Sequence, residues 1–192
     1  VGMVLGTDRR VLVLALARMA DAIGNSFLII VLPAYIAAGA VDITGLVAST
    51  VPILELEITE ELLIGILLSL FGFLNSLAQP FAGQLSDRAG RRRVFILAGL
   101  ALLAVSSAAY AFVAEYVSLV VIRAVQGLGA ALTIPCTIAL VNEYATRTTR
   151  GGNMGVFNTF RLIGFGFGPI VAGGVVLAGP YVFSVGSRTL SI

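Results

Sequence analysis

The chain has 192 residues, of which 58% are hydrophobic and only 11% are charged. A soluble domain is usually about a quarter charged, so this composition excludes an ordinary water-soluble domain. All twelve cationic residues are arginines. The sequence has no histidine, which excludes histidine-based metal sites and imidazole proton relays. We expect no metal and no cofactor. The arginines are scattered between apolar stretches and form no basic face, which argues against a nucleic-acid partner.

Five apolar runs follow one another along the chain. A helix needs about 20 residues to cross the roughly 30 Å hydrocarbon core of a bilayer. The runs cover residues 11–37, 62–85, 94–114, 117–142 and 154–179. The first run is too long for a signal peptide and four more follow it, so we interpret it as a span. The predicted fold class is all-α, a polytopic membrane helix bundle of about five transmembrane helices.

The charges between the runs predict the topology. The first connection, residues 38–61, is acidic and has no cation; its acids are Asp42, Glu55, Glu57, Glu60 and Glu61. Nine arginines lie outside the runs, and all of them except Arg188 are at the N-terminus or in the second and fourth connections; the eight are Arg9, Arg10, Arg88, Arg91, Arg92, Arg93, Arg147 and Arg150. Cations are retained on the cytoplasmic side during insertion. We therefore predict a cytoplasmic N-terminus in a multi-pass protein of the cell membrane, either an inner or a plasma membrane.

Polar side chains form stripes within four of the five runs. Arg18, Asp21 and Asn25 are spaced three and four apart, and therefore share one helical face of the first span. The other stripes are Asn75 and Gln79 in the second run, Arg123, Gln126, Thr133 and Thr137 in the fourth, and Asn158 and Arg161 in the fifth. A charge in mid-bilayer costs about 2.5–3.5 kcal/mol, so such groups normally face protein or water. We expect helices one, two, four and five to surround a hydrated cavity with the third outside; the alternative is that the stripes only join helices by hydrogen bonds.

Asp21 is the one carboxylate well inside a run. Desolvation favours the protonated form of a carboxyl group, whereas Arg18, one turn away, favours the ionised form. Asp21 is therefore a candidate proton site. The alternative is a static ion pair with Arg18 or Arg123 that orients the helices.

Small residues recur every four positions in the last two runs. The two ridges are Gly164, Gly168 and Ala172 in the fifth run and Gly127, Ala131 and Pro135 in the fourth. Such ridges let helix backbones approach closely in a bilayer. Pro169 lacks a backbone donor and is expected to bend the fifth helix. The one cysteine, Cys136, lies in an apolar run, as an inert buried thiol would.

A sequence motif lies between the second and third runs, where residues 83–93 read GQLSDRAGRRR. Gly83 allows tight packing at the end of a helix, Gly90 permits a turn, and Asp87 can pair with an arginine or face a helix N-terminus. The segment resembles G-x-L-a-D-r-x-G-r-k, the signature of the loop between helices two and three in the major facilitator superfamily. The resemblance implies that Gly83, Asp87, Arg88, Gly90 and Arg91 belong to a latch of the outward-facing state; the alternative is simple anchoring by positive charge.

Two further motifs resemble the same family. Residues 123–131 read RAVQGLGAA, similar to its fourth-helix motif R-x-x-Q-G-x-G-A-A, which implies a role for Arg123 in proton transfer. Residues 164–173 read GFGFGPIVAG, similar to the motif G-x-x-x-G-P-x-x-G-G of drug–proton antiporters, with Ala172 in place of a glycine. The match implies packing roles for Gly164, Gly168, Pro169 and Gly173, and makes the drug–proton antiporters the most similar group.

Members of this family usually carry twelve helices in two halves of six, and alternating access needs both halves. The resemblance implies that residues 1–192 are an incomplete N-terminal transmembrane half: a fragment, a truncated product, or one part of a two-chain assembly. The expected partners are the lipid bilayer, a small-molecule substrate, protons, and a missing C-terminal half or second chain.

The motifs together imply a secondary transporter, most similar to exporters that exchange amphipathic compounds for protons. Asp21 is the expected proton site and Arg123 its electrostatic modulator. The expected substrate path is lined by Arg18, Asn25, Asn75, Gln79, Gln126, Asn158 and Arg161. The alternatives are a proton symporter or uniporter for a small polar solute, and a non-transporting truncated membrane remnant. An enzyme is disfavoured because the sequence shows no nucleophile–base pair, metal cluster or phosphate loop.

Overall fold

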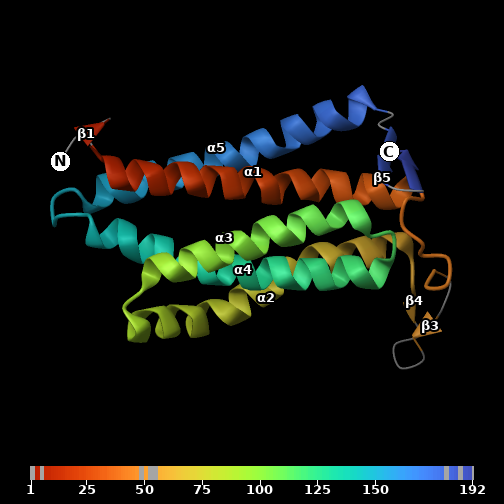
Figure 1. Cartoon of the computed structure of the whole chain (residues 1–192), viewed down its shortest axis with the longest axis horizontal. Helices are drawn as coiled ribbons and strands as arrows, with labels where there is room; N and C mark the ends of the chain where they lie inside the picture. The colour runs from red at the N-terminus through yellow and green to blue at the C-terminus, as the bar shows by residue number, and fades with distance from the viewer. Residues whose placement is uncertain are drawn as a thin grey trace. The chain divides into compact units, whose positions relative to one another are not determined.

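The structure, a computed structural model, describes residues 3–4, 7–47, 50–51, 56–179, 182–185 and 188–191. Its elements in chain order (Figure 1) are β1 (Met3–Val4), β2 (Thr7–Asp8), α1 (Arg9–Ala37), β3 (Thr50–Val51), β4 (Leu56–Glu57), α2 (Glu60–Ala89), α3 (Arg92–Ala109), the 3-10 helix η1 (Tyr110–Phe112), α4 (Tyr116–Glu143), α5 (Arg150–Ala178), β5 (Val182–Val185) and β6 (Arg188–Ser191). In this part of the chain five helices are long and apolar enough to cross a membrane. The predicted all-α fold class is confirmed.

Short antiparallel ribbons accompany the helices. β1 pairs with β2, β3 with β4, and β5 with β6. In the longest ribbon, formed by β5 and β6, Val182 is paired with Ser191 and Val185 with Arg188. The ribbons could not be predicted from the sequence, because strands this short leave no periodic pattern of apolar residues.

The chain divides into two compact units, which are described separately. The α1/α5 unit comprises Val1–Ala34 and Cys136–Ile192, and the α2–α4 unit comprises Tyr35–Pro135. Helix α4 is shared, since it belongs to the second unit as far as Pro135 and to the first from Cys136. The predicted cavity among helices one, two, four and five involves both units and stays a prediction.

In the α1/α5 unit, glycines bring two helices together. α1 and α5 run side by side in the same direction (Figure 1). A β-carbon added at Gly164 would lie 2.9 Å from Cβ of Ala22, and one added at Gly168 would lie 2.8 Å from the carbonyl oxygen of Ile23. No larger residue permits so close an approach. The ridge predicted at Gly164 and Gly168 therefore packs α5 against α1.

The rest of the fifth-helix motif behaves differently. α5 continues through Pro169, which is exposed. A β-carbon added at Gly173 would meet no atom within 4 Å. The close packing is thus concentrated at Gly164 and Gly168, together with the fully buried Ala172.

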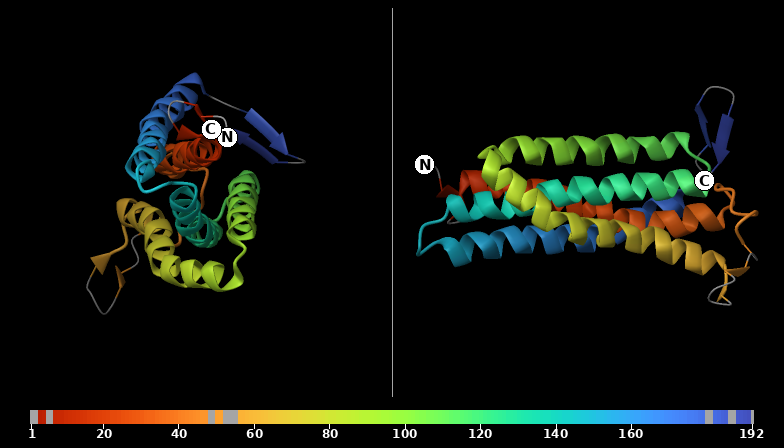
Figure 2. Two further views of the ribbon diagram at one scale, coloured as in Figure 1. Left: turned by 90° about the vertical axis from the view of Figure 1, so that its left-hand side faces the viewer. Right: turned by 90° about the horizontal axis from the view of Figure 1, so that it is seen from below.

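Glycines also set the spacing in the α2–α4 unit. A β-carbon added at Gly129 of α4 would lie 3.0 Å from the carbonyl oxygen of Gly99 in α3, and one at Gly127 would lie 2.8 Å from that of Phe71 in α2. α4 therefore packs closely on both neighbours, and Figure 2 shows the α3 and α4 ribbons side by side. At Gly83, by contrast, an added β-carbon would lie 3.7 Å from Cβ of Pro135. This is an ordinary contact, so the tight packing expected at Gly83 is absent.

Local signals set the limits of α2. Thr59 accepts a hydrogen bond from the backbone N–H of Leu62 at 3.3 Å, and the acids Glu60 and Glu61 lie in the first turn, where the helix dipole favours negative charge. At the other end Gly90 has a φ of 62°, and its N–H donates to the carbonyl oxygen of Ser86 at 3.0 Å. The turn expected at Gly90 is present. α2 therefore extends beyond the apolar run 62–85 at both ends.

Contacts within each unit join connections that the predicted topology places on one side of the membrane. In the α2–α4 unit, the N–H of Asp42 donates to the carbonyl oxygen of Ala114 at 2.9 Å, which joins the first and third connections. In the α1/α5 unit, the guanidinium of Arg10 lies 4.5 Å from the ring centroid of Tyr144, which joins the N-terminus to the fourth connection. A cytoplasmic N-terminus stays a prediction. Glu55 lies outside the described residues.

Candidate functional site

An ion pair lies within α1. Nη1 of Arg18 donates a hydrogen bond to Oδ2 of Asp21, as a spacing of three residues on one helical face allows. The two side chains are 11% and 12% exposed, so the ion pair is largely buried within the protein. Asn25, one turn further along the same face, is half-buried. The pair expected from the spacing is present, and both the proton-site and the static-pair hypotheses are consistent with it.

Arg161 of α5 comes close to this pair because of the way α5 packs on α1. Gly164 meets Ala22, and the next glycine of the ridge keeps the same offset between the two helices. Arg161 precedes Gly164 by three residues and therefore lies on the same face of α5. The offset therefore places Arg161 near Arg18.

The charge of Arg161 acts on its neighbours. It is close enough to Arg18 for the two guanidinium groups to repel each other, while Asp21 attracts Arg18. Nε of Arg161 is buried and has no hydrogen-bond partner among the described residues. Asn158, which was predicted on the same stripe, is exposed. This part of the α1/α5 unit therefore combines two cations with one carboxylate.

A second polar network surrounds Arg123 in the α2–α4 unit. Arg123 is only 1% exposed. Its Nη1 donates to Oε1 of Gln126 at 3.2 Å, and its guanidinium lies 5.5 Å from the ring centroid of Phe71. Oε1 of Gln126 also accepts from the hydroxyl of Tyr110 at 3.1 Å, and Nε2 of Gln126 donates to Oγ of Ser107 at 3.1 Å. Among the described residues Nε of Arg123 has no partner, and no carboxylate forms an ion pair with Arg123.

Sequence reasoning missed three members of this network: Phe71, Ser107 and Tyr110. Tyr110 lies near the end of an apolar run, where interfacial aromatic residues are common, and a serine such as Ser107 does not mark a polar face by itself. In the structure α3 and η1 supply both of these side chains. No spacing within a single helix identifies them, because they reach Gln126 only through tertiary packing.

The remaining polar stripe residues are satisfied within their own helices or are buried. Nε2 of Gln79 donates to Oδ1 of Asn75 at 3.1 Å, and both residues are half-buried on α2. Oγ1 of Thr133 donates to the carbonyl oxygen of Gly129 at 3.0 Å, and Thr137 is 2% exposed. These groups have less unfilled hydrogen-bonding capacity than the arginines.

The loop between α2 and α3 contains an ion pair. Nη2 of Arg92 lies 2.7 Å from Oδ1 of Asp87, and Nε of Arg92 also donates to that oxygen at 3.2 Å. Asp87 thus pairs with an arginine, as expected. Arg88 and Arg91 are exposed. Since Asp87 is exposed as well, the pair adds little to stability on its own.

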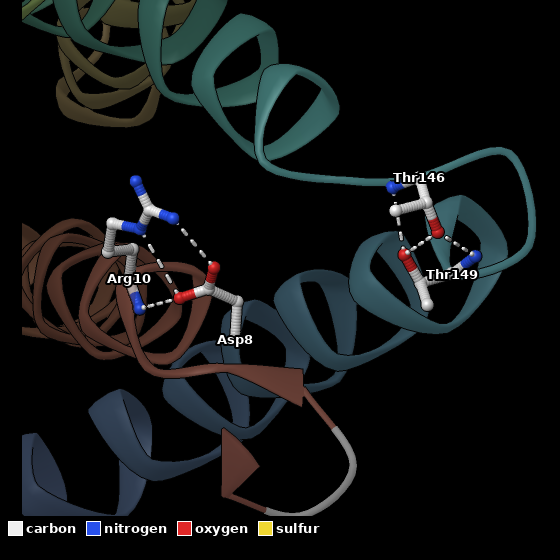
Figure 3. A network of polar contacts seen from close by, with 4 residues as sticks. All are labelled: Asp8, Arg10, Thr146 and Thr149. Atoms are coloured by element: carbon white, nitrogen blue, oxygen red, sulfur yellow. Dashed lines mark hydrogen bonds and ion pairs between the residues drawn. The ribbon is translucent and has the colours of Figure 1, made fainter. Parts of the chain in front are cut away.

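Figure 3 shows the polar contacts near the N-terminus and the fourth connection. Asp8 accepts hydrogen bonds from the backbone N–H of Arg10 at 2.9 Å and from its Nη2 at 3.1 Å. These bonds, the backbone one first, hold the pKa of Asp8 below its ordinary value. Thr146 and Thr149 bond to each other through backbone N–H and hydroxyl groups. Both segments are therefore held by local hydrogen bonds.

Comparison with known proteins gives a consistent set of relatives. The family model described as Major Facilitator Superfamily matches residues 14–186. The chain is 32% identical over 118 residues to the "uncharacterized MFS-type transporter" of Methanocaldococcus jannaschii, covering 62% of the chain and 30% of that protein. It is 33% identical over 106 residues to citrate exporter 1 of Aspergillus niger (55% and 20%), and 28% identical over 121 residues to multidrug transporter QDR2 of Candida glabrata (63% and 20%). The matched residues span less than a third of the length of each of these relatives.

Proposed function

The chain belongs to the Major Facilitator Superfamily, and from this premise we propose that it forms part of a proton-coupled exporter of amphipathic compounds. Its relatives are transporters rather than enzymes, and its apolar helices make it a multi-pass membrane protein. The observation that carries the proposal is the largely buried carboxylate of Asp21, which is paired with Arg18, and Arg18 lies close to Arg161.

The proposed proton site works through the charge of Asp21. When Asp21 takes up a proton, it loses its charge attraction to Arg18, and the balance of charge on this face of α1 changes. A local charge change of this kind can favour one of two conformations of a bistable protein. Arg123 is the proposed electrostatic modulator, because it is a buried cation whose partners among the described residues are neutral. The proposed substrate path is lined by Arg18, Asn25, Asn75, Gln79, Gln126, Asn158 and Arg161.

Export is supported by two observations. The segment 164–173 is similar to a drug–proton antiporter motif, and two of its glycines, Gly164 and Gly168, pack α5 on α1. Two of the relatives are named as a citrate exporter and a multidrug transporter. Alternating access requires a second half, so we propose that the chain acts together with one, with its N-terminus on the cytoplasmic side of the cell membrane. The loop with Asp87, Arg88 and Arg91 is the proposed latch.

The test replaces Asp21 by asparagine in the complete transporter that contains this chain. Proteoliposomes with an imposed pH gradient are loaded in turn with an anionic, a neutral and a cationic fluorescent amphipathic probe. Asp21→Asn is expected to abolish proton-driven probe movement while expression is unchanged. Asp42→Asn is the matched control, because Asp42 is exposed and lies in the first connection. Undiminished proton coupling in Asp21→Asn would instead support the static ion pair.

The excess of positive charge beside Asp21 favours a second candidate function, a proton symporter for a small polar solute. Protonation of Asp21 would release Arg18 to bind a solute, so proton and solute would bind together rather than compete. The sign of the pH change in vesicles when substrate is added separates the two functions. Internal acidification during uptake indicates symport, and external acidification indicates antiport.

A further inference from the structure

The face that α1 and α5 share carries more positive than negative charge. Arg18 and Arg161 lie on it, and Asp21 is the carboxylate that pairs with Arg18. An arginine side chain keeps its charge at any physiological pH. Among the described residues of the α1/α5 unit, Arg161 has no carboxylate partner. Within this described part of the unit, one positive charge is therefore left without a counter-ion.

Both arginines lie too deep in their helices to reach the membrane surface easily. α1 begins at Arg9 and α5 at Arg150. At 1.5 Å per residue, Arg18 and Arg161 are roughly 14–17 Å from these helix starts, about half of a 30 Å hydrocarbon core. An unpaired charge at this depth is costly. A lipid headgroup at the surface is therefore a poor counter-ion for Arg161.

Arg161 also has unused hydrogen-bonding capacity. A guanidinium offers five donors in a planar fork that matches a carboxylate. The buried Nε of Arg161 has no acceptor among the described residues. Leaving a buried donor of a charged group unsatisfied is destabilising. An acceptor that carries negative charge would remove both this cost and the charge imbalance.

We propose that the solute carried by this transporter is an organic anion whose carboxylate binds Arg161, with Arg18 beside it. The inference rests on the proposed transport function, because it names the substrate class of the same site. A single carboxylate fits best, since it matches the one uncompensated positive charge. A phosphate monoester carries close to two negative charges and would leave the site with an excess of negative charge.

The test measures binding of radiolabelled benzoate to the complete transporter in nanodiscs. Benzamide, benzylamine and phenyl phosphate serve as competitors, since they keep the ring and change only the head group. In the native protein unlabelled benzoate is expected to displace the label, with phenyl phosphate weaker and the neutral and cationic compounds ineffective. Lactate and lactamide form a second matched pair of smaller size.

The variants examine the same prediction from both directions. Arg161→Gln is expected to weaken benzoate binding by about 10- to 100-fold, as the loss of a charged hydrogen bond implies, and Arg161→Lys should restore part of it. Arg150→Gln is the matched control, with the same charge change on an exposed residue of the same helix. Asp21→Asn should bind benzoate more tightly, because the neutral amide competes less for the guanidinium groups, and such a gain would favour the symporter over the proton exchanger. A misfolded variant would not gain affinity.

The outcomes separate this inference from the proposed function. Equal displacement by benzoate and benzamide, no binding of any carboxylate, or unchanged binding by Arg161→Gln would overturn the anion site. Proton-driven movement of benzylamine without benzoate binding would overturn it too, while the transporter proposal stands. Tight, Arg161-dependent benzoate binding with no proton-coupled transport would support the anion site and overturn the proposed proton coupling.

Discussion

Two arginine sites in the described part of the chain differ in what surrounds the charge. In the α2–α4 unit, Arg123 is enclosed by Phe71 of α2, by Gln126 of its own helix and, through Gln126, by Tyr110 of η1. All of these partners are neutral. In the α1/α5 unit, Arg18 has a carboxylate partner in Asp21, and Arg161 has a second cation as its neighbour.

The difference indicates that the Arg123 network stabilises the fold, whereas the α1/α5 site is suited to binding a ligand. The Arg123 network connects donors and acceptors from several elements, so its side chains are held in place before any ligand arrives. In the α1/α5 site the positive charge of Arg161 has no counter-ion among the described residues, so the site needs a negatively charged group from elsewhere. We therefore expect substitutions near Arg123 to affect mainly stability, and substitutions near Arg161 to affect mainly binding.

The most disruptive change should be Gly164→Leu, because it removes the close approach on which the α1/α5 site depends. A β-carbon at Gly164 would lie 2.9 Å from Cβ of Ala22, and helix backbones cannot yield at such a contact without separating. We expect loss of the monodisperse peak in fluorescence-detected size-exclusion chromatography. Gly166→Leu on the same helix should keep that peak, since an added β-carbon there meets no atom within 4 Å. Equal behaviour of the two variants would contradict the packing described for α1 and α5.

A smaller but still large loss is expected from Gln126→Ala in the other unit. The change leaves Nη1 of Arg123 and the hydroxyl of Tyr110 without their acceptor, at a cost of about 1–3 kcal/mol for each group. Thermal unfolding in detergent should show a clear decrease in Tm. Gln79→Ala is the control, because Gln79 is half-buried and bonds to Asn75. A decrease for Gln126→Ala no larger than that for Gln79→Ala would show that the network does not support the fold.

The helices of this fold could be predicted from sequence because the signals are local. Apolar runs of sufficient length predict the spans, and Thr59 and Gly90 are recognisable cap residues that place the ends of α2. The Arg18–Asp21 pair follows from their spacing on one helix. The short ribbons could not be predicted, because a strand such as Thr50–Val51 carries no pattern.

The arrangement around the arginines could be predicted only in part. Sequence spacing places Arg161 on the ridge face of α5, but its position beside Arg18 depends on the offset between two helices that meet at Gly164. That offset results from packing between distant segments, which periodicity within one helix does not encode. The same holds for Tyr110, whose hydroxyl reaches Gln126 from a different element.

The smallest effect is expected for Tyr110→Phe, which separates the two roles of the Arg123 network. The substitution removes one hydroxyl donor, but Oε1 of Gln126 still accepts from Arg123, so no group is left unsatisfied. The cost should be about 0.5–1.5 kcal/mol, seen as a modest decrease in Tm. In the Gln126→Ala background the same substitution should cost nothing or even stabilise, since the hydroxyl has already lost its acceptor. Additive effects in this double-mutant cycle would show that Tyr110 and Gln126 act independently, and the α2–α4 unit would then resemble the α1/α5 unit in having a weakly supported arginine.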